Sequence, residues 1–153
     1  MKAGAGNAEI RFPEELFPLE GFRGVHDLPK ASVLIIEEAQ KIAIVSIEIV
    51  MLWDDFLEKC REAVAEITDT PKQNVWIHVT HAITTPHAPG GPRVGLGGQV
   101  IEGKEKEDAS LVLHKRSLYE QTIMQALQEA AKKAAEEAAK KAAEGKTEGL
   151  KAT

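Results

Sequence analysis

The chain has 153 residues, which is enough for one domain with a substantial core and too few for two domains of ordinary size. Its hydrophobic fraction of 43% and charged fraction of 28% are typical of a soluble globular protein. With 24 acidic and 19 basic residues, a net charge of −5 and no long basic cluster, the chain is not expected to bind nucleic acid.

Neither a membrane span nor an export signal is expected. The longest apolar run, residues 42–53, is interrupted by Ser46 and Glu48 and is shorter than the roughly 20 residues that a spanning helix needs. Residues 1–9 lack the apolar segment of a signal peptide. The single cysteine, Cys60, cannot form a disulfide within the chain, so a cytoplasmic location is expected.

Two apolar, β-branched runs predict strands at residues 31–36 and 41–50, joined by a polar turn. Residues 8–12 could form a further short strand. The short connection predicts a hairpin. The nearly continuous apolar character of residues 41–50 favours a central strand that is covered on both faces.

The segment 54–68 changes to the period of a helix, because its apolar residues recur on one face: Phe56, Leu57, Cys60, Val64 and Ile67. Asp54 and Asp55 lie at its start, where carboxylates suit the positive end of the helix dipole. Another apolar run predicts a strand at 74–80. Strand, helix and strand form a βαβ unit, which places 41–50 and 74–80 in parallel. The predicted fold class is therefore α/β, with a mixed, mainly parallel sheet and flanking helices.

The last third of the chain is expected to form one long helix, from about Ser110 to Glu144. Its second half is rich in alanine, with lysine and glutamate alternating four residues apart, and is expected to protrude or to pack on another chain. Gly145 and Gly149 are expected to end it. The predicted organisation is an α/β half-domain over residues 1–109 with a His-, Gly- and Pro-rich loop that begins at 82, a long helix over 110–145 that packs on this half-domain or on a partner, and a tail over 146–153.

The stretch from residue 75 to residue 92 carries the strongest chemical signal. A predicted strand leads directly into a loop rich in proline and glycine, and three of the five histidines lie within ten positions, namely His78, His81 and His87. In open α/β sheets, ligands bind at the carboxyl ends of strands. Imidazole is the commonest metal ligand and suits proton transfer near neutral pH, so any chemistry of this protein is expected here.

Other polar residues that stand out have ordinary structural explanations. His78 is expected to be a structural or sheet-packed histidine, and His26 a turn histidine. Cys60 lies on the apolar face of its helix and is expected to be inert core. Glu48 is expected to be paired in the sheet or to lie near the site, because an unpaired buried charge is costly. The glycines at 90–98 lack the pattern of a phosphate-binding loop and are expected to order on assembly.

Five short segments in the first 92 residues follow one another in the order found at the start of a known catalytic domain: residues 3–10 (AGAGNAEI), 24–31 (GVHDLPKA), 44–48 (IVSIE), 74–76 (NVW) and 80–81 (TH). Together they resemble the neutral/alkaline ceramidase family. The hallmark of that family is a strand ending in Thr-His-Thr-His-Ser and followed closely by Pro-Gly-Gly. Here Pro89-Gly90-Gly91 follows His87.

The resemblance implies a large α/β domain that hydrolyses an amide with one zinc ion. His81 matches the zinc-binding histidine of the family, and His87 matches the second histidine, which lies beside the metal at the substrate. The family places these histidines two positions apart, whereas here they are six positions apart. Its other metal ligands lie further downstream than this chain extends, so a second polypeptide or another copy of this chain is expected to supply them.

The leading prediction is therefore a metal-dependent hydrolase of amide or related bonds, of which this chain is one part. Zinc is the expected metal, and the substrate is expected to be a small molecule other than ceramide itself. The alternative is a non-catalytic assembly or binding subunit that keeps the scaffold without a complete site, a reading that the residues inserted between His81 and His87 favour. A homo-oligomer with sites at its subunit interfaces is a third reading.

Overall fold

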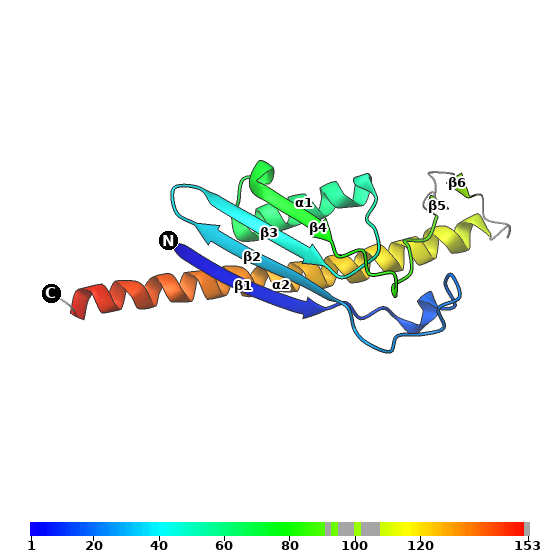
Figure 1. Ribbon diagram of the computed structural model, residues 1–153, viewed down its shortest axis with the longest axis horizontal. Helices are drawn as coiled ribbons and strands as arrows, with labels where there is room; N and C mark the ends of the chain where they lie inside the picture. Colours follow the sequence, from blue (N-terminus) through cyan, green and yellow to red (C-terminus); the bar gives the residue numbers. More distant parts are fainter. Residues whose placement is uncertain (91–92, 95–99, 102–107, 152–153) are drawn as a thin grey trace.

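The computed structural model describes residues 1–90, 93–94, 100–101 and 108–151, and its body is a four-stranded sheet (Figure 1). The strands lie in sequence order: β1 (Lys2–Glu9), β2 (Lys30–Glu37), β3 (Lys41–Ile47) and β4 (Val75–Val79). The pairs β1–β2 and β2–β3 are antiparallel, and β3–β4 is parallel. The mixed α/β architecture is thus confirmed. The expectation of a mainly parallel sheet is wrong, because β1 adds a second antiparallel pairing beside the hairpin.

Two helices accompany the sheet. The first, α1 (Asp54–Thr68), connects β3 to β4, as predicted from its apolar period. The second, α2 (Ala109–Lys151), is the predicted long C-terminal helix. Shorter elements are the 3-10 turns η1 (Glu14–Leu16) and η2 (Lys72–Asn74) and the antiparallel pair β5 (Arg93–Val94) and β6 (Val100–Ile101). None of the described helices is both long and apolar enough to cross a membrane.

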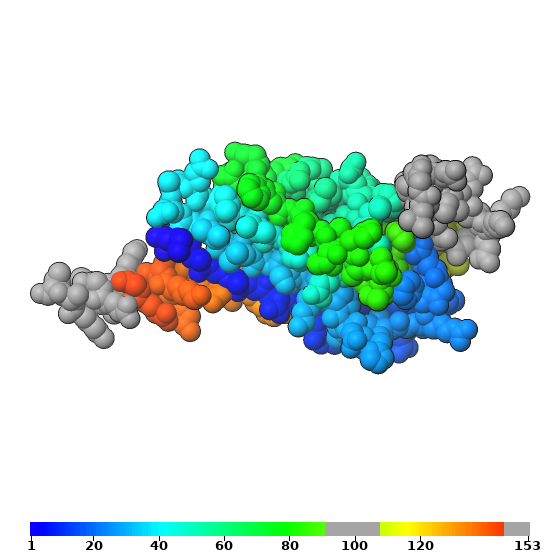
Figure 2. Space-filling view, in the orientation of Figure 1, coloured from blue at the N-terminus to red at the C-terminus, as the bar shows by residue number. Residues whose placement is uncertain are grey.

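The core lies between one face of the sheet and both helices. Because side chains alternate along a strand, the odd-numbered residues of β2 and β3 point into this core: Ala31, Val33, Ile35, Ala43, Val45 and Ile47. The opposite face is open, with Leu34 exposed by 38% and Trp76 by 61%. Figure 2 looks onto this face, where the strands hide much of α2. The expectation that residues 41–50 are covered on both faces is therefore wrong.

The alanine-rich half of α2 packs on β1 and does not stand free of the domain. Ala130, Ala131 and Ala134 are fully buried. A Cβ atom added to Gly4 of β1 would lie 2.2 Å from the backbone oxygen of Ala134, so only glycine permits this approach. The small residues on both sides bring the two backbones together. Of the alanine-rich half, only the C-terminal end extends past the sheet (Figure 1).

Charged side chains of the same helix cover the outer edge of β1. The backbone N–H of Ala5 donates to Glu137 at 2.6 Å, and the ammonium group of Lys133 donates to the carbonyl of Asn7 at 3.1 Å. These contacts satisfy groups of an edge strand that could otherwise pair with another chain. The lysine–glutamate pattern therefore serves the fold of this chain. The helix continues to Lys151, so the expectation that Gly145 ends it is wrong.

Candidate functional site

The histidine-bearing loop starts where β4 ends, at the carboxyl edge of the parallel pair β3–β4. Two hydrogen bonds continue the pairing beyond the strands, from Thr80 N–H to the carbonyl of Ile47 at 3.0 Å and from Ala82 N–H to that of Ile49 at 3.2 Å. The loop is therefore tied to the sheet at its beginning. This is the edge at which parallel strands of α/β proteins present their ligand-binding groups, as the sequence predicted.

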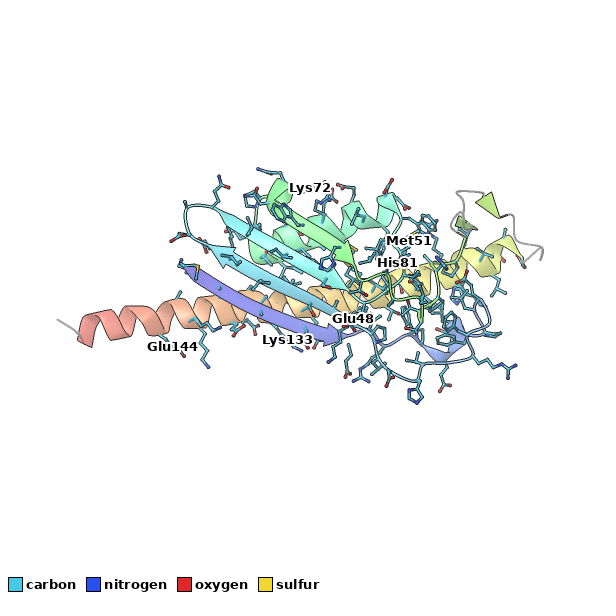
Figure 3. The ribbon with its side chains drawn as sticks, in the orientation of Figure 1. Glu48, Met51, Lys72, His81, Lys133 and Glu144 are labelled. Carbon is cyan, nitrogen blue, oxygen red and sulfur yellow. The ribbon has the colours of Figure 1, made fainter. Side chains whose placement is uncertain are left out.

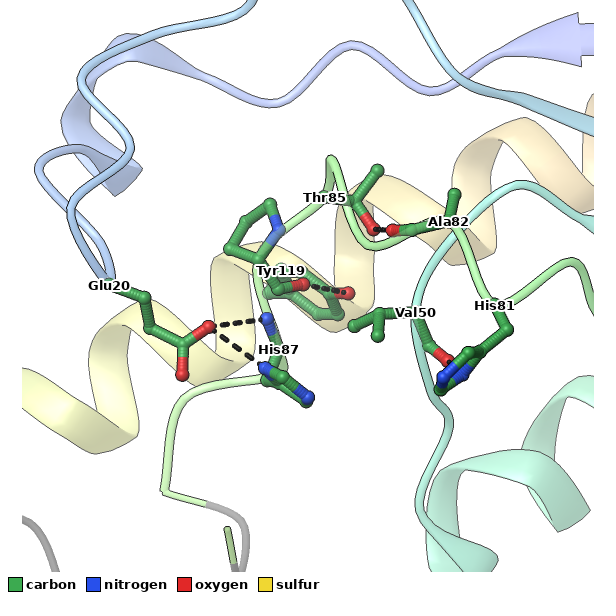
Figure 4. Close-up of polar contacts among 8 residues, drawn as sticks. Glu20, Val50, His81, Ala82, Thr85, His87 and Tyr119 are labelled. Carbon is green, nitrogen blue, oxygen red and sulfur yellow. Dashed lines mark hydrogen bonds and ion pairs between the residues drawn. The ribbon is translucent and has the colours of Figure 1, made fainter. Parts of the chain in front are cut away.

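His81 lies in the left-handed backbone region, with φ at 57°. Its side-chain Nδ1 is 2.9 Å from the carbonyl oxygen of Val50 (Figure 4). A carbonyl can only accept a hydrogen bond, so this contact requires the proton on Nδ1 and leaves the lone pair on Nε2. A metal-binding histidine is typically held in this way, with one ring nitrogen bonded to a carbonyl and the other turned to the metal.

His87 is held by Glu20, which comes from the segment between β1 and β2. One carboxylate oxygen of Glu20 accepts the backbone N–H of His87 at 2.8 Å and lies 3.0 Å from its Nδ1 (Figure 4). The ring is therefore oriented at two points by the same oxygen. Among the described residues, no hydrogen bond engages Nε2 of either His81 or His87.

The loop between the two histidines is supported from α2. The hydroxyl of Tyr119 is buried and donates to the carbonyl of Pro86 at 3.0 Å. Its ring stacks on Phe12, with ring centroids 5.0 Å apart. Burial raises the pKa of Tyr119 well above its usual range, so the group remains a neutral donor. Thr85 closes a turn within the loop by donating to the carbonyl of Ala82 at 2.8 Å.

One unusual backbone conformation lies at this site. Within the described part of the chain, the non-glycine residues with positive φ are Glu20, Asp69 and His81. Asp69 is the C-cap of α1, where a left-handed residue is common. Glu20 precedes Gly21 in a tight turn closed by Leu19 and Phe22, and such turns need positive φ at both central residues. His81 has no such role; its conformation costs about 1–3 kcal/mol, and strain of this kind often reflects function.

The remaining histidines lie away from this pair. His78 is exposed on the open sheet face, opposite Ser46, so the expectation of a sheet-packed side chain is wrong. His26 is almost fully exposed, and its Nδ1 lies 3.2 Å from a carboxylate oxygen of Asp27. The rings of His81 and His87 also lie apart, each on its own partner (Figure 4). The part of the chain that the structure describes contains no group of three or more side chains able to hold a metal.

Two other predictions from the sequence are confirmed. Cys60 is buried, and burial raises the pKa of its thiol to about 12, so it is inert core. Glu48 is paired in the sheet, since its side chain accepts the backbone N–H of Lys30 at 2.8 Å. Most of the glycine segment at 90–98 lies outside the described residues.

Glu20, Val50 and Tyr119 are the site residues that the sequence did not reveal. Each contacts a residue more than 30 positions away in the sequence. Glu20 does so through its carboxylate, Val50 through its carbonyl and Tyr119 through its hydroxyl. A carbonyl has no signature in the sequence, and one glutamate among many is not distinctive. The local signal at Glu20 was its position before Gly21, since both have positive φ in one turn.

Comparison with known proteins leaves the family open. No protein-family model matches the chain, and no curated protein sequence matches it. The resemblance to ceramidases therefore rests on the residues quoted above and stays a prediction.

Proposed function

We propose that this chain is one part of a metal-dependent hydrolase of amide or related bonds, similar to the ceramidases. One observation carries the proposal: Nδ1 of each loop histidine is bound to a fixed acceptor. The other ring nitrogen, Nε2, is thereby oriented to bind a metal or to exchange a proton with a substrate. Such outer partners fix the tautomer of metal-binding and catalytic histidines. His81 would be the zinc ligand, as the resemblance to the ceramidases implies, with the carbonyl of Val50 as its outer partner.

A catalytic zinc site takes about three protein ligands and keeps one position open for water. His81 would supply one of them. Because the described residues contain no group of three ligating side chains, the other ligands would come from a second polypeptide or a further copy of this chain. Zinc, when bound, would polarise a carbonyl group and make water more acidic.

His87 would act on the substrate. With its proton on Nδ1 facing Glu20, Nε2 can accept a proton from water or from a substrate group. With both nitrogens protonated, the ring forms an ion pair with Glu20 and can donate to a carbonyl oxygen that becomes negative. Tyr119 and Glu20 would hold the loop in place during either step.

The experiment compares zinc content and amide hydrolysis for protein isolated from its own cells without chelator. His81→Ala should lose zinc and activity while the protein stays folded, because the residue is exposed and lies outside the core. His87→Ala should keep zinc and lose activity. His114→Ala, an exposed histidine on α2, is the matched control and should lose neither. Retention of zinc and activity in His81→Ala would refute the proposal.

A second candidate is a non-catalytic assembly or binding subunit. The absence of three ligating side chains from one place among the described residues favours it. In that case the histidines would only tie the loop to Val50 and Glu20. Zinc would then be missing from the isolated protein, and His81→Ala would change its assembly and activity little.

A further inference from the structure

A pocket lies beside the histidine loop, on the side that the two histidines do not face. Its volume is about 610 Å³, within the range of sites for small organic molecules. The loop supplies one wall, through Thr80, Ala82, Thr84, Thr85 and Pro86. His81 and His87 do not line it. The pocket is therefore a separate feature, and its ligand does not depend on the proposed hydrolase.

Apolar and aromatic groups line most of the remaining surface. They come from the chain before β2: Phe12, Phe17, Phe22, Val25, Leu28 and Pro29. Such a lining favours a ligand with an apolar body, because it takes that body out of water. The faces of aromatic rings also attract cations. This part of the pocket therefore favours an apolar molecule and tolerates a positive charge.

The charged groups of the lining make it acidic. Glu48 contributes a carboxylate at the sheet end of the pocket, and Asp27 contributes a second one near the rim. Among the described residues, the lining contains neither lysine nor arginine, but it includes His26, whose Nδ1 lies 3.2 Å from the carboxylate of Asp27. The acidic character of the pocket therefore rests mainly on Glu48. A positively charged ligand would therefore meet a favourable potential, and an anionic one would meet repulsion.

Glu48 is held in a fixed position. Its backbone N–H donates to the carbonyl of Lys30 at 2.9 Å, and its side chain accepts the N–H of the same residue at 2.8 Å. This reciprocal pair ties the carboxylate to β2 (Figure 3 shows its place at the end of the sheet). An acceptor that is already ordered loses little entropy when a ligand binds.

We propose that this pocket binds a compact organic amine, with its ammonium group at Glu48 and its apolar body among the phenylalanines. The ammonium group donates a charge-assisted hydrogen bond to the carboxylate. The hydroxyls of Thr80 and Thr84 also line the pocket and offer neutral hydrogen-bond partners to a polar group of the ligand. The volume is in the range of sites for drug-sized ligands, so an arylalkylamine is small enough to enter.

The test uses three ligands that share one apolar body: 4-phenylbutylamine, 4-phenylbutanol and 4-phenylbutyrate. Their dissociation constants for the full chain are measured by ligand-observed NMR at pH 7. The amine should bind at least fivefold more tightly than the alcohol, and the carboxylate most weakly. Equal dissociation constants for the three ligands, or tighter binding of the carboxylate, would overturn the proposal.

Variants then place the ligand. Glu48→Gln should reduce the binding of the amine to that of the alcohol, whereas Glu38→Gln, in the exposed turn between β2 and β3, should change nothing. Phe22→Ala should weaken the amine and the alcohol by a similar factor. A preference for the amine that survives Glu48→Gln would contradict the assigned position. Because hydrolase activity is not a readout here, failure of this proposal leaves the proposed function untouched.

Discussion

Replacement of Gly4 by alanine should destabilise the protein, because β1 and α2 approach each other too closely for a side chain. The new Cβ would lie 2.2 Å from the oxygen of Ala134 and 2.5 Å from the nitrogen of Ala138, both backbone atoms. Ordinary contact begins at 3.4 Å, so helix and strand would have to separate by the difference, about 1.2 Å. Backbone atoms cannot rotate away as a side chain can.

Two opposing effects set the size of the loss. Overpacking of a core costs about 1–3 kcal/mol and sometimes more. Replacing a glycine by alanine lowers the conformational entropy of the unfolded chain, which stabilises the folded state by about 0.4–1 kcal/mol. Because the new Cβ would clash with backbone atoms of α2, we expect the free energy of unfolding to fall by about 2 kcal/mol in total. For a domain of this size, that lowers the melting temperature by roughly 4–8 °C.

The assay is urea unfolding followed by far-ultraviolet circular dichroism. The matched control is Gly24→Ala, since a Cβ at Gly24 would have no heavy atom within 4 Å and the variant should stay within about 0.5 kcal/mol of the original protein. A Gly4→Ala variant as stable as this control would show that the helix does not pack on β1 as described.

Four further predictions concern the site and the core. Tyr119→Phe leaves the carbonyl of Pro86 without its donor and should cost about 1–3 kcal/mol in urea unfolding; an unchanged midpoint would contradict this. Cys60, with its pKa raised to about 12, should resist a thiol reagent at pH 8 until the protein unfolds. Its buried neutral thiol should also make stability fall as pH rises above the ordinary value of 9.0, where only the unfolded state ionises, with Cys60→Ala as the comparison. Glu20→Gln should slow hydrolysis without loss of zinc, because Glu20 contacts His87 and not His81. Hydrolysis at the normal rate would contradict the role of Glu20 in orienting His87.

Local patterns predicted the elements between residues 30 and 80 well. Helix α1 has its predicted bounds, and β2, β3 and β4 lie within one to three residues of theirs. The strand β1 was misplaced, at residues 8–12 in place of Lys2–Glu9. Glycine and alanine have low strand propensity, and their presence in β1 serves the close approach of α2, which no local pattern reveals.

The sequence predicted the packing and pairing of these elements less well than their positions. The parallel pairing of β3 and β4 followed from the connecting helix, but the antiparallel position of β1 depends on a long connection. Nearly continuous apolar character at 41–50 predicted two covered faces, whereas Ile42 and Ile44 remain half-exposed. The histidine loop was found from residue types alone, while the groups that orient it come from distant parts of the chain.

The central claim is that His81 binds a metal in a site completed by another polypeptide chain. The most direct test is a native mass spectrum of the protein isolated from its own cells without chelator, compared with that of His81→Ala. The account predicts a metal-bearing complex with a second polypeptide or with further copies of this chain, and loss of the metal in the variant. A metal-free species, alone or assembled, would contradict it.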